Sequence, residues 1–194
     1  AVKGAALLTS RQVINEVGLF DGEFWSYYED ADFCHRVLLA GYDCWYYPQA
    51  VLYHAGGGTS QSFDDANIQF HNFKNKLMSF LKNLSPASLL YILPLYLALS
   101  SALSSCYVII GKSNHSAALA RAVWYNVCAL PVTLQKRRRT QRLRRRSDTE
   151  INLLYRVDPR PSYYLALFRD VARYADDPVV PDAVTQASHP ASHQ

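Results

Sequence analysis

Residues 29–53 have the sequence EDADFCHRVLLAGYDCWYYPQAVLY, in which one pattern of apolar residues gives way to another. From Asp30 onward the apolar residues recur at helical spacing, and Gly41 is a typical helix stop. From Tyr42 to Tyr47 aromatic residues lead to a proline, and residues 50–53 are mostly apolar, which is typical of two extended segments. A helix followed by strands predicts part of an α/β domain.

The residues upstream of this segment show the same alternation. Residues 4–8 form a short apolar run that predicts a strand. Ser10 is a good N-cap for a helix from Arg11 to Val17, and Gly18 would end that helix. Sixty residues are too few for a complete doubly wound sheet. We therefore expect residues 1–61 to be the C-terminal half of a larger domain, and the absence of an initiating methionine favours the same interpretation.

The character of the sequence changes after the glycines at 56–58. Residues 62–83 predict an amphipathic connecting helix with Lys74 and Lys82 among its polar positions. No charged residue occurs from position 83 to 111, and a helix over residues 89–110 would be about 33 Å long, enough for a hydrocarbon core of about 30 Å. We expect apolar membrane-associated helices over 84–134, a basic and amphipathic helical region over 135–175, and a disordered tail over 176–194.

Three arrangements compete for the apolar region. It could form a helical hairpin through the bilayer, lie flat in the interface, or pack as soluble core helices. Four serines between positions 100 and 105, together with Pro94, favour the interface. Arg121 and Asn126 make a second full span, over residues 117–134, costly. We therefore expect a peripheral or shallowly inserted protein on the cytoplasmic face of the cell membrane, with the hairpin as the alternative.

The net charge of +4 is unevenly distributed. Eight of the 20 basic residues lie between positions 136 and 146, so the rest of the chain carries 12 basic and 16 acidic groups. This basic run lacks aromatic residues for base stacking and follows a long uncharged stretch. It therefore predicts binding to anionic lipid headgroups and not to nucleic acid. A solvated helix without a partner remains an alternative. The expected headgroup ligands are Lys136, Arg137, Arg138, Arg139, Arg142, Arg144, Arg145 and Arg146.

Three carboxylates, Glu29, Asp30 and Asp32, stand at the expected start of a helix. One interpretation is capping, because anions at a helix N-terminus are favoured by about 0.3–1 kcal/mol each. The other is catalysis. Asp30 continues the apolar stripe of Phe33 and Cys34 and follows a group of aromatic residues. A carboxylate beside others in a partly desolvated pocket has a raised pKa, which suits a general base.

The remaining motifs exclude several other classes of site. The glycines at 56–58 fit neither a P-loop nor a dinucleotide-binding turn. His54 precedes them at the end of an extended segment, where a role in a site competes with a structural one. Four cysteines without a C-x-x-C pair argue against a disulfide scaffold and a structural zinc. The 49% hydrophobic content excludes collagen and wholesale disorder.

Five motifs in order resemble the C-terminal half of the catalytic domain of family 2 glycosyltransferases, especially the rhamnosyltransferase-like branch. They are GAALLTSR at 4–11, VGLFDGEF at 17–24, YEDADFCHR at 28–36, AGY at 40–42 and HAGG at 54–57. The resemblance is strong over residues 1–83 and looser as far as residue 148. It implies a Rossmann-like GT-A fold and inverting transfer from a nucleotide-sugar to a glycan or lipid-linked acceptor, as in polysaccharide and cell-wall biosynthesis.

The resemblance also implies roles for individual residues. Asp30 would be the catalytic base, and Glu29 beside it would hold the acceptor or tune the base. His54 would help to hold a divalent metal, Mg²⁺ or Mn²⁺, against the donor diphosphate. Asp32 would orient the start of the helix. The expected substrate-binding residues are Gly4, Ala5, Trp25, Tyr28 and Asp32.

The main departure from the family pattern is that no Asp-x-Asp motif precedes Asp30. We therefore expect that this chain alone neither binds a nucleotide-sugar tightly nor turns it over. The rival hypothesis is a non-catalytic module that binds a membrane surface through the basic run at 136–146.

Overall fold

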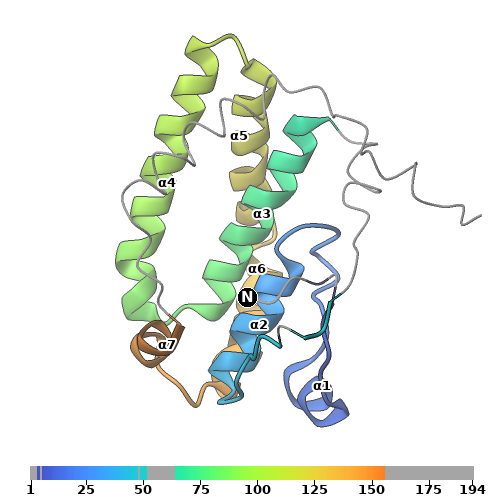
Figure 1. Cartoon of the computed structure of the whole chain (residues 1–194). Helices are drawn as coiled ribbons and strands as arrows, with labels where there is room; N and C mark the ends of the chain where they lie inside the picture. Colours follow the sequence, from blue (N-terminus) through green and yellow to red (C-terminus); the bar gives the residue numbers. More distant parts are fainter. Residues whose placement is uncertain (1–3, 5, 48, 52–63, 156–194) are drawn as a thin grey trace, which may run out of the picture. The chain divides into compact units, whose positions relative to one another are not determined.

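The computed structural model describes residues 4, 6–47, 49–51 and 64–155, which belong to one compact unit. Helices make up 71% of these residues, and no strand occurs among them. The expected α/β, GT-A-type arrangement is therefore wrong for the described part of the chain. The helices are α1 (Arg11–Val17), α2 (Glu29–Leu39), α3 (Asp65–Asn83), α4 (Pro86–Ile109), α5 (Ser113–Cys128), α6 (Leu130–Leu143) and α7 (Asp148–Tyr155) (Figure 1).

The described parts of the segments expected to be strands have no regular structure. A strand is stable only when a neighbouring strand satisfies its backbone groups, and no described segment pairs with these residues in that way. The backbone N–H of Tyr42 instead donates to the Val37 carbonyl at 3.2 Å, at the end of α2. Trp45 and Tyr46, which follow, are 83% and 84% exposed. Residues 5, 52 and 53 of the expected strands lie outside the described residues.

The short helix α1 matches its predicted bounds. The Ser10 hydroxyl accepts a hydrogen bond from the Val13 N–H at 3.2 Å, and Gly18 ends the helix at a φ of 81°. The apolar face of α1 packs against α2 in a small core of Val13, Val17, Phe33, Val37 and Ala40.

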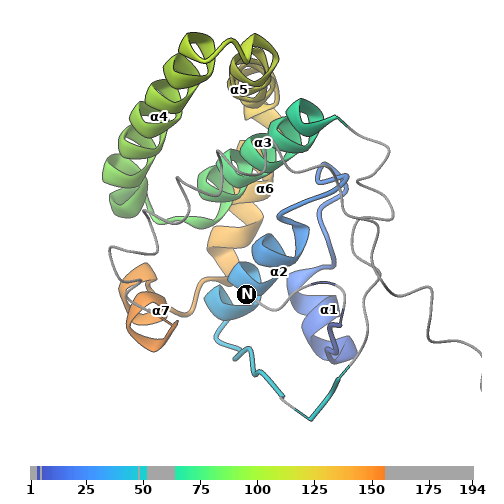
Figure 2. The same cartoon turned by 45° about the horizontal axis from the view of Figure 1, so that its top comes forward.

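Helix α3 lies at the centre of the described helices and contacts α2, α4, α5 and α6 (Figures 1 and 2). Leu77 and Met78 of α3 are buried, as are Ala118 and Ala122 of α5. Small residues on α5 allow the two helix axes to approach closely. Lys74 and Lys82 are also buried, at 4% and 2% exposed, so their expected placement on a polar face is wrong.

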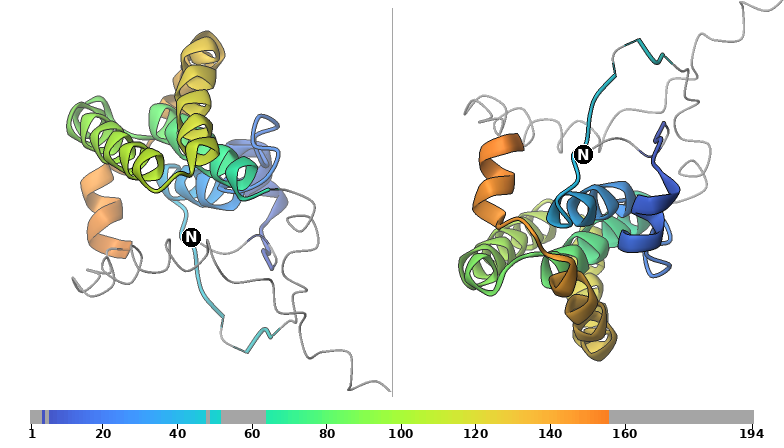
Figure 3. Two further views of the ribbon diagram at one scale, coloured as in Figure 1. Left: turned by 90° about the horizontal axis from the view of Figure 1, so that it is seen from above. Right: turned by 90° about the horizontal axis from the view of Figure 1, so that it is seen from below.

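The second apolar stretch is divided at Ala129 into α5 and α6, which are bent by 69° from one another (Figure 3). Pro131 lies in the first turn of α6, where its missing N–H costs no helical hydrogen bond. The Thr133 hydroxyl donates to the Ala129 carbonyl at the break, at 2.9 Å. The sequence therefore contains two helices here instead of one continuous apolar segment.

Helix α4 is long and apolar enough to cross a membrane. Several of its large apolar side chains are exposed, namely Leu90, Tyr91, Leu95, Leu99, Val108 and Ile109. It joins α5 through a turn that contains Gly111 at a φ of 78°. The two helices contact each other, whereas α4 contacts α3 much less than α5 does (Figure 2).

Candidate functional site

The turn before α2 is strained and held by α3. Tyr27 and Tyr28 have φ angles of 68° and 69°, in the left-handed region that bulky residues rarely adopt. Such residues cost about 1–3 kcal/mol each and persist only where the surroundings enforce them. The side-chain amide of Asn75, which is fully buried, donates to the carbonyls of Ser26 at 2.7 Å and Tyr27 at 2.6 Å. Asn75 thus fixes the approach of the chain to the carboxylates.

Glu29 and Asp30 form the first turn of α2 beside this strained turn. Asp30 is half-buried; its Oδ2 accepts from the Gly4 N–H at 2.9 Å and its Oδ1 from the Ala31 N–H at 2.7 Å. Glu29 Oε2 is buried and accepts no hydrogen bond from the described residues. Asp30 is therefore held in place and reachable by solvent, and it lies next to Glu29, whose Oε2 atom has no hydrogen-bond donor among the described residues.

Asp32 has a different environment from its two neighbours. It is fully buried and accepts from Arg36 Nε at 2.9 Å, Lys82 Nζ at 3.1 Å and Asn83 Nδ2 at 2.9 Å. Burial alone would raise the pKa of Asp32, but the charges of Lys82 and Arg36 hold it below its usual value. Its oxygens are bound by donors of the protein itself, so Asp32 joins α2 to α3. This position agrees with orientation of the helix better than with contact to a substrate.

The Asp32 contacts belong to a larger buried charge cluster that the sequence did not reveal. Lys82 Nζ also donates to Asp21 Oδ2 at 2.6 Å, and Lys136 pairs with Asp21 Oδ1. Arg36 extends the cluster to α1, because its guanidinium donates to the carbonyls of Val17, Gly18 and Leu19. The one sequence signal was a lysine within the apolar run FLKNL, at the end of the predicted connecting helix.

Asp21 gives the cluster a defined dependence on pH. Burial would raise the pKa of Asp21, but Lys82 and Lys136 lower it to about 2, against 3.8 for an unperturbed aspartate. Since the folded state holds this proton less tightly than the unfolded state, the stabilisation is present above about pH 4 and disappears as the pH falls towards 2. A difference of this size corresponds to roughly 2.5 kcal/mol.

We therefore predict that the free energy of unfolding falls less in Asp21→Asn than in wild type between pH 5 and pH 2, by about this amount. The measurement is the free energy of unfolding, by chemical denaturation monitored by circular dichroism, at both pH values. The matched control is Asp65→Asn, which changes an exposed aspartate in the first turn of α3. An Asp21→Asn variant with the pH dependence of wild type would contradict the assignment.

Two aromatic residues expected to bind substrate lie near the same turn. Trp25 is 58% exposed, and its ring lies 5.2 Å from the ring of His71, centroid to centroid. Tyr28 is partly buried; burial, and then the charges of Asp32 and Asp30, raise its pKa to about 12. Tyr28 therefore stays neutral at physiological pH, and Trp25 offers an exposed aromatic face.

Five cations of the basic run bind other parts of the chain. Arg137 donates to the carbonyls of Leu81 and Leu84 at 2.6 and 2.7 Å, and Arg144 to that of Asn83, at the C-terminal end of α3. Cations at this end of a helix interact favourably with its dipole. The remaining contacts join Lys136 to Asp21, Arg145 to Glu16 and Ala40, and Arg146 to Asp43 and Tyr42. Arg138, Arg139 and Arg142 are exposed.

The remaining expected residues divide into two groups. Gly4 is exposed and contacts Asp30, as described above, whereas Ala5 and His54 lie outside the described residues. Among the residues that are described, no group of three or more His, Cys, Asp or Glu side chains could hold a metal ion.

Comparison with protein-family models, with curated proteins and with solved structures finds no match to this chain.

Proposed function

We propose that this protein is an inverting glycosyltransferase, which moves a sugar from a nucleotide-sugar to a glycan or lipid-linked acceptor with Asp30 as the general base. The observation that carries the proposal is the pair of carboxylates at the start of α2. Asp30 is positioned by two N–H donors and is accessible, and Glu29 beside it has a buried oxygen without a partner among the described residues. The sequence motifs around this pair supply the reaction class.

In the proposed reaction the acceptor hydroxyl attacks the anomeric carbon of the donor. Its proton passes to the Asp30 carboxylate as the new C–O bond forms. The bond between the anomeric carbon and the donor phosphate breaks, and the nucleoside diphosphate leaves with the electron pair. The N–H groups of Gly4 and Ala31 keep the carboxylate oriented, and Glu29 lies beside it with a buried Oε2 atom that has no hydrogen-bond partner among the described residues. The exposed ring of Trp25 offers a stacking surface for a sugar.

A divalent cation remains part of this proposal. Mg²⁺ or Mn²⁺ would offset the charge of the departing diphosphate, with His54 as a ligand. The described residues do not form such a site by themselves, so no step above depends on the ion.

The reaction is tested with membranes from cells that produce the natural gene product containing this chain. The membranes receive a panel of nucleotide-sugars, with and without an added lipid or glycan acceptor fraction. We expect acceptor-dependent release of nucleoside diphosphate from one donor and incorporation of its sugar into the acceptor with inverted anomeric configuration. Absence of transfer from every donor, with protein present in wild-type amounts, would contradict the proposal.

We further propose that α4 is embedded shallowly in the cytoplasmic face of the cell membrane. The serines that suggested a polar stripe are satisfied locally: Ser100, Ser101 and Ser105 donate to carbonyls four residues earlier, and Ser104 shares a hydrogen bond with Ser116. Hydroxyl groups bonded in this way cost less in hydrocarbon than free ones. Helix α5 is less suited to full insertion because one of its faces packs on α3.

The membrane proposal predicts the effect of charges on α4. Leu95 and Leu99 are 60% and 58% exposed, and an aspartate at the centre of a membrane helix costs about 2.5–3.5 kcal/mol. We expect the double variant Leu95→Asp, Leu99→Asp to move from the carbonate-resistant membrane pellet to the soluble or aggregated fraction. The control is Leu153→Asp on α7, which replaces a leucine that is 77% exposed. Retention of the double variant at the wild-type level would contradict the role of α4.

The rival proposal, a non-catalytic module held to the membrane by the basic run, receives less support from the contacts of that run. Five of its eight cations bind carbonyls and carboxylates of the chain itself, at the ends of α2 and α3 and at Asp21. This leaves Arg138, Arg139 and Arg142 as the cations most available to lipid headgroups. Of these three, Arg139 also lines a cavity.

A further inference from the structure

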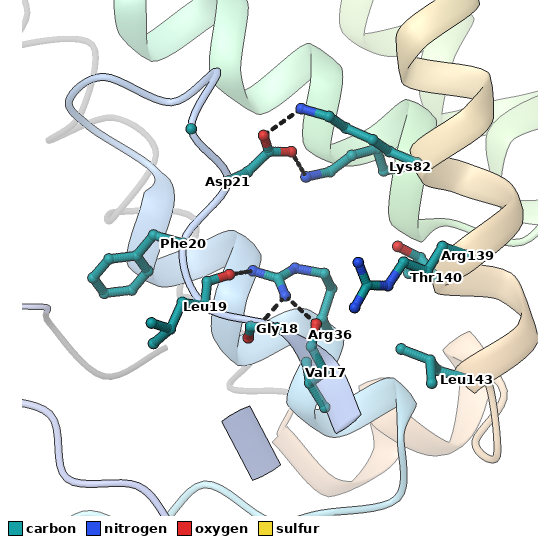
Figure 4. Close-up of a pocket in the computed structure, with 12 residues that line it drawn as sticks. Val17, Gly18, Leu19, Phe20, Asp21, Arg36, Lys82, Arg139, Thr140 and Leu143 are labelled. Atoms are coloured by element: carbon teal, nitrogen blue, oxygen red, sulfur yellow. Dashed lines mark hydrogen bonds and ion pairs between the residues drawn. The ribbon is translucent and has the colours of Figure 1, made fainter. Parts of the chain in front are cut away.

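A cavity of about 340 Å³ lies between the end of α1, the loop that follows it, and helices α2, α3 and α6 (Figure 4). Its volume is at the small end of the range of about 300–1,000 Å³ typical of ligand sites. Four cationic side chains line the cavity together with a single carboxylate, that of Asp21; the cations are Arg36, Lys82, Lys136 and Arg139.

These charges do not cancel. Asp21 pairs with Lys82 and Lys136, and Asp32 behind the cavity pairs with Lys82 and Arg36. Two carboxylates thus serve three cations. Among the described residues, no carboxylate lies within ion-pair distance of the fourth cation, Arg139, so the cavity carries an excess of positive charge.

Two guanidinium groups converge on one point of the cavity wall. A Cβ atom placed on Gly18 would lie 3.8 Å from Arg36 Nη1 and 4.0 Å from Arg139 Nη2. Figure 4 shows both side chains directed into the space between the loop and α6. Gly18 has a φ of 81°, so glycine permits the turn that brings the loop to these two groups. Arg36 contributes mainly positive charge here, because four hydrogen bonds within the protein already engage its guanidinium. The planar guanidinium of Arg139 can match the oxygens of phosphate in geometry as well as in charge.

We propose that this cavity binds a phosphate or diphosphate group, with Arg139 as the residue that recruits it. The biological source of this phosphate group rests on the proposed function, because nucleotide-sugars and lipid-linked acceptors both carry such groups. The preference of the site for an anion follows from the charges that line the cavity and does not depend on the proposed function. Arg36 is already fixed by three carbonyls and Asp32, so it is preorganised, whereas Arg139 is exposed and free to close on the anion.

The test is binding of inorganic pyrophosphate to the purified chain, measured by isothermal titration calorimetry at low and at high salt. We expect binding that Arg139→Gln weakens at least about tenfold, the effect of losing one charge-assisted contact. The matched control is Arg138→Gln, which removes an exposed arginine of the same helix that does not line the cavity. Because the altered side chains are exposed, circular dichroism and thermal melting should be unchanged in both variants.

A second arm identifies the source of the phosphate group, using flotation with vesicles of phosphatidylcholine alone or with phosphatidic acid. Extra binding to the acidic vesicles, beyond the binding to phosphatidylcholine alone that α4 accounts for, would identify a lipid headgroup if pyrophosphate displaces it and Arg139→Gln selectively weakens it. Equal binding to the two kinds of vesicle, or extra binding to the acidic vesicles that is indifferent to pyrophosphate, would identify a soluble diphosphate.

Absence of pyrophosphate binding, or equal losses in the two arginine variants, would overturn the site. Since this binding is measured without a sugar donor, failure of the transfer assay alone would leave the result standing.

Discussion

Replacement of Asp30 by asparagine is expected to reduce sugar transfer by about 10²–10⁴-fold, the range that a general base contributes. Asparagine has the shape of aspartate, and its single carbonyl oxygen can still accept a hydrogen bond from Gly4 or Ala31. The amide nitrogen cannot take a proton from the acceptor hydroxyl. The measurement is acceptor-dependent release of nucleoside diphosphate by membranes containing equal amounts of wild-type and variant protein.

The control for this variant is Asp65→Asn, which alters another acidic residue in the first turn of a helix, exposed and away from α2. It should transfer sugar at the wild-type rate. Asp65→Asn should keep the wild-type melting temperature. Asp30→Asn should remain folded and melt slightly lower, because it loses one hydrogen bond from a backbone N–H and a negative charge at the start of α2. Turnover by Asp30→Asn above a tenth of the wild-type rate would show that another group removes the proton.

The helices of this chain were largely predictable, because their signals are local. Ser10 and Gly18 delimit α1, and the uncharged stretch after position 83 corresponds to α4. The conformation of the extended segments was not predictable in the same way. An extended run such as Tyr42–Tyr47 becomes a strand only if a partner pairs with it, and its sequence carries no information about that partner. The same limit explains why α/β was the wrong fold class for the described residues.

The candidate site was predicted in part. The grouping of Glu29 and Asp30 is visible in the sequence, since three carboxylates in four residues are conspicuous. The strained Tyr27–Tyr28 turn is not, because nothing in a tyrosine pair indicates left-handed backbone, and the clamp that holds it comes from Asn75, almost fifty residues away. Long-range partners also changed the interpretation of the basic run. Arg137 and Arg144 donate to carbonyls at the C-terminal end of α3, and only the packing of α6 against α3 reveals these contacts.

Removal of the Asp32 carboxylate is expected to have the largest effect on stability. It is fully buried and accepts from the cationic groups of Arg36 and Lys82 and from the amide of Asn83. Breaking a buried ion pair by removing one partner typically costs about 3–5 kcal/mol, because the remaining charge stays desolvated. In Asp32→Ala, Lys82 would keep Asp21 as a carboxylate partner, whereas Arg36 would have no carboxylate partner among the described residues.

We therefore expect Asp32→Ala to lower the free energy of unfolding by about 3–5 kcal/mol, measured by chemical denaturation in mild detergent with circular dichroism as the signal. Asp65→Ala, on the exposed first turn of α3, should cost less than about 0.5 kcal/mol. Asp32→Asn should lie between them, since an amide oxygen can still accept from one donor but carries no charge to balance Arg36. If Asp32→Ala were no more destabilising than Asp65→Ala, the buried cluster would not be what holds α2 against α3. Asp30 would then owe its position to the Asn75 clamp and to the N–H groups of Gly4 and Ala31.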